Sequence, residues 1–293
     1  MKSLTLSLLT LFFYTALSGQ VIDREFPDSK GRIKLLGEAS YDRLTKAPFK
    51  EWFTKNEETY EPDENDIAEL KTALNSVDSI SIFMGTWCGD SKREVPRFTK
   101  MLKEANYDFN KLSIICVDNT WNNYKQSPEN QQADANIHRV PTFIFHSNQE
   151  EVGRIVERPV ASLEKDLIAV AEGNYKPSYS AVQFLHNYLE ENGVASLTEN
   201  ETEVVEQLRL QVKAWNELTT YGKMLLTSWK IKEAVRVLEI NSKMFPEEEY
   251  AQLHLANAYY LTGDYEKTEL CCREALAINP DSEFAQTLMA RLK

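Results

Sequence analysis

The sequence predicts an α/β domain followed by an all-α domain built from helical repeats. Three observations carry this prediction. An apolar run over residues 79–84 is typical of a buried strand, and a helical pattern follows it almost at once. A second apolar, β-branched run occupies residues 112–117 and indicates a central strand. The last part of the chain matches itself at a period of 34 residues, which is typical of repeats of two helices.

The first residues have the pattern of a secretory signal peptide. Met1 and Lys2 precede an apolar run over residues 4–16, and small residues follow it. The run is shorter than the roughly 20 apolar residues that a membrane-spanning helix needs. We therefore expect residues 1–19 to be removed, and the mature chain to be periplasmic or secreted with no membrane insertion after cleavage. The alternative is a buried N-terminal helix.

Residues 20–175 are expected to form the α/β domain with an N-terminal extension. The polar residues 24–47 lack a periodic pattern, so we expect docking to order them. Aromatic residues at 49, 52 and 53 predict a short helix that packs on the sheet. Residues 66–77 predict an amphipathic helix, because apolar residues recur at helical spacing. These apolar residues are Ile67, Leu70, Leu74 and Val77.

The strand at 79–84 leads directly into Trp87-Cys88-Gly89-Asp90-Ser91, where a helix is predicted to begin. A cysteine at the N-terminus of a helix meets unpaired N–H groups and the positive end of the helix dipole. Both favour the thiolate, which is the nucleophilic form of cysteine. Cys88 is therefore the candidate catalytic residue.

This arrangement resembles the active-site strand, turn and helix of the thioredoxin superfamily. A second motif, Val140-Pro141-Thr142, is similar to the segment that carries the cis-proline of thioredoxins, and a predicted strand follows it. A further strand at 152–158 and a helix at 161–171 complete the order of that fold. The resemblance covers roughly residues 60–173 and is to exported bacterial thioredoxin-like proteins, here with a single thiol in the motif.

The resemblance implies a role for each residue around the thiol. Trp87 would shield the site, and Gly89 would allow the tight turn before the helix. Ser91 would offer its hydroxyl to the sulfur of Cys88. Two further supporting residues, Val140 and Pro141, would hold an extended substrate strand. Asp90 stands where thioredoxins have proline.

Two departures from the family indicate a protein with one working thiol. Ser91 replaces the second cysteine, which would otherwise resolve a mixed disulfide. Ile82 stands where many thioredoxins keep a buried carboxylate that assists that second cysteine. The expected activity is that of a monothiol disulfide oxidoreductase or isomerase, acting on protein thiols or disulfides or on small thiols. The alternative is a non-catalytic scaffold or protein-interaction module.

Charges near the thiol leave its reactivity open at this point. The carboxylate of Asp90 disfavours the thiolate, whereas Lys92, Arg93 and the helix N-terminus favour it. His138 precedes Pro141 by three residues and could act at the same rim as an acid. An exposed loop histidine without such a role is the favoured reading.

The other three cysteines do not form a disulfide framework. Cys116 lies within a buried strand pattern and is expected to be a small core residue. Cys271 and Cys272 are adjacent on a predicted helix and cannot easily pair with each other.

Composition excludes several classes of partner and cofactor. The formal net charge is −12, and no basic patch could follow a phosphate backbone, so nucleic acid is not an expected partner. The four histidines show no metal-ligand spacing, and the chain has no phosphate-binding loop. We expect neither a metal nor a cofactor.

Residues 176–293 are expected to form the helical domain, after a linker at 173–177 that contains Gly and Pro. The unit over residues 255–280 is similar to the tetratricopeptide repeat, and a degenerate copy precedes it. Helices at 178–191, 203–215 and 281–292 would complete the array. The repeats would recruit a protein partner or dock on the first domain. A stripe of Tyr259, Tyr260 and Tyr265 could face a ligand, although packing between helices is favoured.

Overall fold

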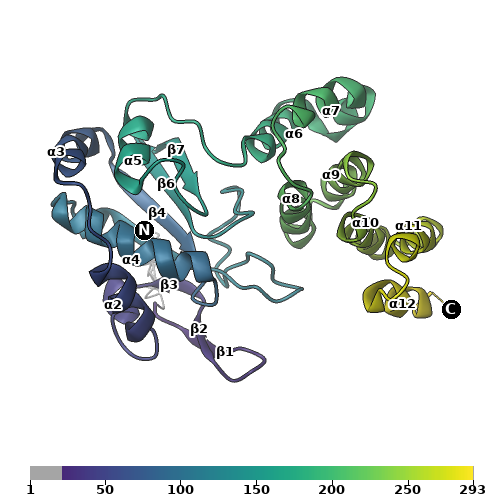
Figure 1. The fold of residues 1–293 in the computed structure, drawn as a ribbon, viewed down its shortest axis with the longest axis horizontal. Helices are drawn as coiled ribbons and strands as arrows, with labels where there is room; N and C mark the ends of the chain where they lie inside the picture. The colour runs from purple at the N-terminus through teal and green to yellow at the C-terminus, as the bar shows by residue number, and fades with distance from the viewer. Residues whose placement is uncertain (1–21, 293) are drawn as a thin grey trace, which may run out of the picture.

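The computed structural model describes residues 22–292, so the predicted signal peptide lies outside the described residues. An α/β region comes first, and a series of helices from residue 180 onward follows it (Figure 1). This confirms the predicted order of an α/β region and a helical-repeat region. Within residues 22–292, no helix is both long and apolar enough to cross a membrane.

A mixed five-stranded sheet forms the centre of the α/β region. Its strands, in spatial order, are β3 (Gly37–Ala39), β5 (Leu112–Cys116), β4 (Ser79–Met84), β6 (Thr142–Ser147) and β7 (Glu150–Val156). β4 runs parallel to β5 and antiparallel to β6, while β3 and β7 are antiparallel to their neighbours. The predicted strands at 79–84 and 112–117 are therefore adjacent and lie at the middle of the sheet.

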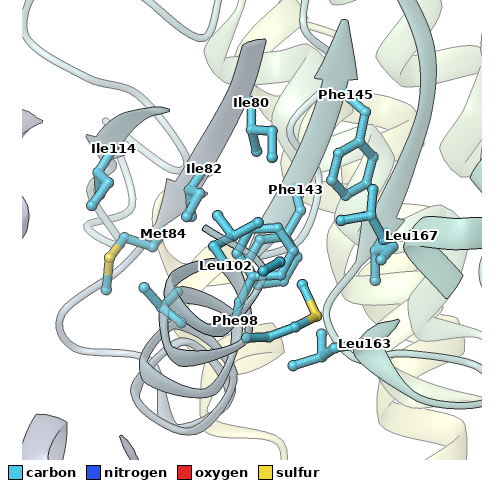
Figure 2. Packing of buried hydrophobic residues seen from close by; sticks show 14 of the residues in the cluster. Ile80, Ile82, Met84, Phe98, Leu102, Ile114, Phe143, Phe145, Leu163 and Leu167 are labelled. Atoms are coloured by element: carbon cyan, nitrogen blue, oxygen red, sulfur yellow. The ribbon is translucent and has the colours of Figure 1, made fainter. Parts of the chain in front are cut away.

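Helices cover one face of this sheet. They are α2 (Lys50–Glu58), α3 (Glu64–Ala73), α4 (Gly89–Glu104) and α5 (Leu163–Ala171). Alternate residues of β4 point to this face, because side chains along a strand alternate between its two sides. Ile80, Ile82 and Met84 are fully buried there (Figure 2). The ring centres of Phe98 on α4 and Phe143 on β6 lie 4.3 Å apart, between helix and sheet.

The segment between β5 and β6, residues 117–141, has no regular helix or strand and covers part of the opposite face. Phe83 of β4 and Ile115 of β5 point to this face, the reverse of their neighbours in the chain. They form a second apolar cluster with Val117 and Ile137. The end of β4 that leads into α4 is therefore apolar on both sides.

The N-terminal residues contain structure that the sequence did not reveal. A short hairpin, β1 (Glu25–Pro27) and β2 (Ile33–Leu35), precedes the edge strand β3, and the short helix α1 (Tyr41–Leu44) follows. The predicted helix around Phe53 is present as α2, and it packs chiefly against α4. The amphipathic helix is present as α3 and a following 3₁₀ turn, with its predicted apolar residues buried.

The helical region consists of successive α-helices, four of which form two closely packed pairs. The helices are α6 (Ser180–Glu199), α7 (Glu201–Arg209), α8 (Asn216–Thr227), α9 (Ile231–Met244), α10 (Glu249–Thr262), α11 (Tyr265–Ile278) and α12 (Glu283–Ala290). α8 packs on α9, and α10 packs on α11. Gly222 allows the first pair to approach closely, because a Cβ atom there would lie 2.7 Å from Leu238. α6 is interrupted at Gly193, where φ is 75°.

The two regions have separate apolar cores but make contact through residues 117–141 (Figure 1). The centre of the Trp121 ring lies 6.2 Å from the ring centre of His254 on α10 and 6.0 Å from that of Phe284 on α12. On α8, the hydroxyl of Thr227 donates to the carbonyl oxygen of Tyr124 at 2.9 Å. The repeats are thus docked on the segment that follows β5.

Candidate functional site

Cys88 is the N-cap residue of α4 and follows the buried strand β4. It is half-buried, and its Sγ lies 3.3 Å from the carbonyl oxygen of Val140, to which the thiol donates. The Val140–Pro141 peptide bond is cis. The structure therefore brings together the two motifs that the sequence placed some fifty residues apart.

Trp87 forms a wall of the site. Its indole Nε1 donates to the carbonyl oxygen of Val117 at 2.8 Å, and its ring packs with Cys88 on the apolar cluster of the second sheet face. The position of the Trp87 ring requires glycine at residue 85, because a Cβ atom there would lie 2.4 Å from the ring. Gly89 has open space where its Cβ would be and does not need positive φ. The glycine required by this turn is thus Gly85, and the role expected of Gly89 was wrong.

Ser91 lies in the first turn of α4 and is completely buried. Its hydroxyl oxygen accepts a hydrogen bond from the backbone N–H of Gly85 at 3.2 Å. Within residues 22–292, no hydrogen bond joins Ser91 to the sulfur of Cys88. The serine therefore stabilises the turn in front of the helix, in contrast to the hydroxyl contact that the resemblance implied.

The charged residues that follow Cys88 in the chain are engaged with other groups. Arg93 pairs with Asp90 at 2.6 Å, and it also pairs with Glu94. Lys92 places its Nζ 5.9 Å from the centre of the Trp52 ring. These two cations were expected to favour the thiolate, but their charges are directed to these other groups.

A buried cation that was not predicted, Lys125, lies against the Trp87 ring. Its Nζ lies 4.5 Å from the centre of the Trp87 ring, and the residue is only 5% exposed. Burial lowers the pKa of Lys125 to about 8, while the charge of Cys88 acts in the opposite direction. Burial also raises the pKa of Tyr124 to about 12. Nothing in the polar sequence around Lys125 indicated that it would be buried.

His138 is buried, so the favoured interpretation, that it is an exposed histidine of a loop, was wrong. Its Nδ1 lies 3.3 Å from the carbonyl oxygen of Asn136, and its ring meets those of Tyr179 and Tyr221 edge to face. Burial lowers the pKa of His138 to about 3. A histidine that remains neutral in this way has a packing role between the two regions.

The other cysteines are buried, as expected for Cys116, and burial raises the pKa of that thiol well above its usual range. Burial likewise raises the pKa of Cys271 to about 12 and that of Cys272 to about 11. All four cysteines are free thiols. In the part of the chain that the structure describes, no cluster of His, Cys, Asp or Glu could hold a metal ion.

The tyrosine stripe of the repeats is divided between packing and exposure. Tyr259 is buried between helices and its hydroxyl donates to Glu239 on α9, which agrees with the favoured packing role. Tyr265 is exposed and its ring lies 5.9 Å from that of Tyr260. A pocket of about 640 Å³ lies elsewhere, where Tyr250 and Phe284 of the repeats face Trp121 of the segment between β5 and β6.

Comparison with known proteins identifies part of the helical region. The sequence profile of the tetratricopeptide repeat family matches residues 250–282, which span α10 and α11. No curated protein and no solved structure matches the chain. Stacked repeats of this type present extended surfaces that bind other proteins. The chain therefore contains a tetratricopeptide repeat, and this repeat supports a protein-interaction role for the helical region.

Proposed function

We propose that this protein exchanges disulfides through the single thiol of Cys88, on a thioredoxin-like domain, and that the helical repeats serve protein interaction. The observation that carries the proposal is the position of the Cys88 sulfur. It lies at the N-cap of α4 and 3.3 Å from the carbonyl oxygen of Val140 in the cis Val140–Pro141 pair. The parallel pairing of β4 with β5 and the antiparallel pairing of β4 with β6 also support the fold assignment.

The chemistry requires one nucleophilic thiolate and an external thiol. The Cys88 thiolate would attack one sulfur of a substrate disulfide, and the substrate S–S bond would break as the mixed disulfide forms. The other substrate sulfur leaves as a thiolate and takes a proton from solvent. A second thiol, from the substrate or a small molecule, then attacks the mixed disulfide and releases Cys88. Ser91 cannot supply that thiol.

Export is part of the same proposal. Residues 1–19 would direct the chain to a periplasmic or extracellular compartment, where disulfides form and persist. The substrates would be protein disulfides or protein thiols, with small thiols as the second partner. Val140 and Pro141 would align an extended substrate segment beside the sulfur.

The first experiment incubates the mature protein with oxidised glutathione and measures the mass of the product. We expect one adduct on Cys88, no adduct on the Cys88→Ser variant, and no reaction of the buried cysteines in the folded chain. Those three buried cysteines are internal controls for unfolding. Absence of the adduct from a folded wild-type chain would reject the proposed exchange.

A second experiment tests the missing resolving step. The wild type should turn over insulin-like disulfides poorly, whereas Ser91→Cys should gain weak dithiol activity. The gain should be weak because Ile82, not a carboxylate, occupies the buried position on β4. Efficient dithiol-type turnover by the wild type would show that the single-thiol mechanism is wrong.

A second candidate function, a non-catalytic interaction module, is favoured by the tetratricopeptide repeat match over residues 250–282. The two candidate functions differ in whether they require the thiol of Cys88. Under this second candidate, a Cys88→Ser chain would replace the wild type fully in cells. Under the proposed function, the same variant would fail.

A further inference from the structure

The backbone that contacts the thiol is held on both sides by one residue. Val140 carries the carbonyl oxygen that accepts from the Cys88 thiol at 3.3 Å. Its neighbours in the chain, Arg139 and Pro141, both bind Glu157, which follows β7. The backbone N–H of Glu157 donates to the carbonyl oxygen of Pro141 at 2.7 Å. The two carboxylate oxygens of Glu157 accept from Nη1 of Arg139 at 3.0 and 3.2 Å.

The helical region supplies the other contacts of Arg139. The ring centre of Tyr179, the N-cap residue of α6, lies 4.3 Å from the guanidinium carbon of Arg139, and the Tyr179 hydroxyl donates to Glu157. Asn216, the first residue of α8, accepts from Nη2 of Arg139 through its side-chain oxygen at 3.2 Å and its carbonyl oxygen at 3.4 Å. The side chains of Arg139 and Glu157 are each only 13% exposed. We call Arg139, Glu157, Tyr179 and Asn216 the Arg139 clamp.

Two residues of the Arg139 clamp have an uncommon backbone conformation. The φ angle is 66° at Glu157 and 63° at Tyr179, in the left-handed region that residues other than glycine rarely adopt. Such residues persist where the surrounding contacts determine their conformation, and they are concentrated at functional sites. Glycine would relieve the strain at both positions, but it would remove the carboxylate and the ring that bind Arg139.

The position of the Val140 carbonyl affects the ionisation of the sulfur. An acceptor oxygen 3.3 Å from the sulfur stabilises the protonated thiol, which donates to it, and repels the thiolate, which cannot donate. A carbonyl group that is free to turn away would lose both effects. The Arg139 clamp holds the residue on each side of this carbonyl, so it acts on the sulfur through that one hydrogen bond.

We propose that Arg139 is a positioning residue through which α6 and α8 hold the Val140 carbonyl oxygen against the Cys88 sulfur and favour the protonated thiol. The proposal rests on the proposed thiol exchange and assigns a control of the same site to the helical region. Arg139 acts through the backbone of Val140 and does not itself contact the sulfur. Loosening the Arg139 clamp therefore increases the fraction of thiolate at neutral pH.

Other titratable groups near the sulfur keep their charges when the Arg139 clamp is loosened by a neutral substitution. They lie on α4, on the segment between β5 and β6, and in the clamp, and they are Asp90, Lys92, Arg93, Tyr124, Lys125, His138, Arg139, Glu157 and Tyr179. Burial raises the pKa of Tyr179 to about 12, so its hydroxyl is neutral at pH 7. Tyr179→Phe therefore removes a hydrogen bond and no charge.

The test measures the rate at which iodoacetamide alkylates Cys88 in the mature protein between pH 5 and pH 10. The double variant Arg139→Met with Glu157→Gln removes one charge of each sign, so the net charge is unchanged. Its rate at pH 7 should rise about fivefold, because a hydrogen bond that favours the thiol is lost. Tyr179→Phe should raise the rate about twofold to threefold. At pH 10, where the thiol is ionised in every chain, the rates should converge.

A second ion pair provides the matched control. Arg236 on α9 is 8% exposed and pairs with Glu201 on α7, so both of its partners lie within the helical region. Arg236→Met with Glu201→Gln should follow the wild-type profile. Unreactive Cys116 reports in every variant that the chain is folded, because this thiol is fully buried. If the Arg139 double variant does not fold by this criterion, the Tyr179→Phe profile decides the question.

The outcomes separate this proposal from the proposed function. If the folded variants keep the wild-type profile or react more slowly at pH 7, while the wild type forms its glutathione adduct, the role of Arg139 is refuted and thiol exchange stands. A wild type that forms no adduct refutes thiol exchange itself. A rise in rate that persists at pH 10 would also refute the role of Arg139, because it would indicate wider access to the sulfur.

Discussion

Acid should weaken the folded protein through His138. The ring is buried, and the carbonyl oxygen of Asn136 can only accept, so Nδ1 carries the proton of the neutral ring. The other nitrogen, Nε2, is buried without a hydrogen-bond partner among the described residues. Protonating it places a charge in an apolar environment, with Arg139, Arg154 and Lys125 adding repulsion. The pKa of His138 is accordingly lowered by burial to about 3.

The size of this acid-induced loss of stability follows from the difference between the pKa of His138 in the folded and in the unfolded state. The folded pKa of about 3 lies below the ordinary value of 6.5, so the stability from neutral His138 is complete above pH 6.5 and is lost progressively as the pH falls toward 3. At pH 4.5 the unfolded chain is two pH units below its own midpoint. At about 1.4 kcal/mol per unit, the loss at that pH is about 3 kcal/mol.

The assay is urea unfolding at pH 7 and pH 4.5, followed by circular dichroism, for the wild type and His138→Phe. The phenylalanine ring keeps the edge-to-face contacts with Tyr179 and Tyr221 but cannot bind a proton. The acid-induced loss should be about 2–3 kcal/mol smaller in the variant than in the wild type. His146→Phe, altered at the half-buried end of β6, is the control and should keep the full loss.

Either of two results would refute this reasoning. An equal acid-induced loss in the wild type and His138→Phe would show that His138 is not the group responsible. An NMR titration in which His138 of the folded protein gains its proton between pH 6 and pH 7 would show that the ring is hydrated and that its burial is not maintained in solution.

Three further substitutions test the packing by their effect on the free energy of unfolding in urea. Asp118→Asn leaves Lys34 buried without its partner, so we expect a loss of about 3 kcal/mol, and a loss below 1 kcal/mol would argue against a buried pair. Gly222→Val should lose about 1–3 kcal/mol by forcing α8 away from Leu238 on α9, whereas an unchanged stability would mean that the helices lie further apart. Trp229→Gly should gain about 1 kcal/mol, because Trp229 is 87% exposed and has a φ of 61°; a clear loss would indicate that its ring is packed.

Sequence patterns predicted the parts of the fold in which local sequence determines burial. The strand over Ser79–Met84 alternates serine and isoleucine at its start and is continuously apolar from Ile82, where it leads toward α4 and is buried on both sides. This signal needs no partner to be recognised. The edge strand β3 was missed because it is three residues long and carries Glu38 between Gly37 and Ala39. Its place in the sheet comes from pairing with β5, which lies far along the chain.

The candidate site was predictable only in the part that its own motifs encode. Cys88 and Val140 come from two recognisable motifs, and the structure places them in contact. The burial of Lys125 and of His138 was not predictable, because aromatic residues distant in the sequence cover each of them. The helix α8 supplies Thr227, which bonds to Tyr124 next to Lys125, and Tyr221, which packs against His138. Burial that arises from a contact between two regions leaves no periodic pattern in either one.

The docking of Trp121 against α10 and α12 has a consequence for the order in which the protein is completed. During synthesis, the strands and helices up to residue 171 emerge before any repeat does. The residues that hold the segment around Lys125, from Thr227 to Phe284, emerge last. A partly synthesised or truncated chain would therefore possess Cys88 and its turn but not the contacts that hold the segment between β5 and β6. The packing of residues 117–141 beside the sheet would then be complete only when the final helices are in place.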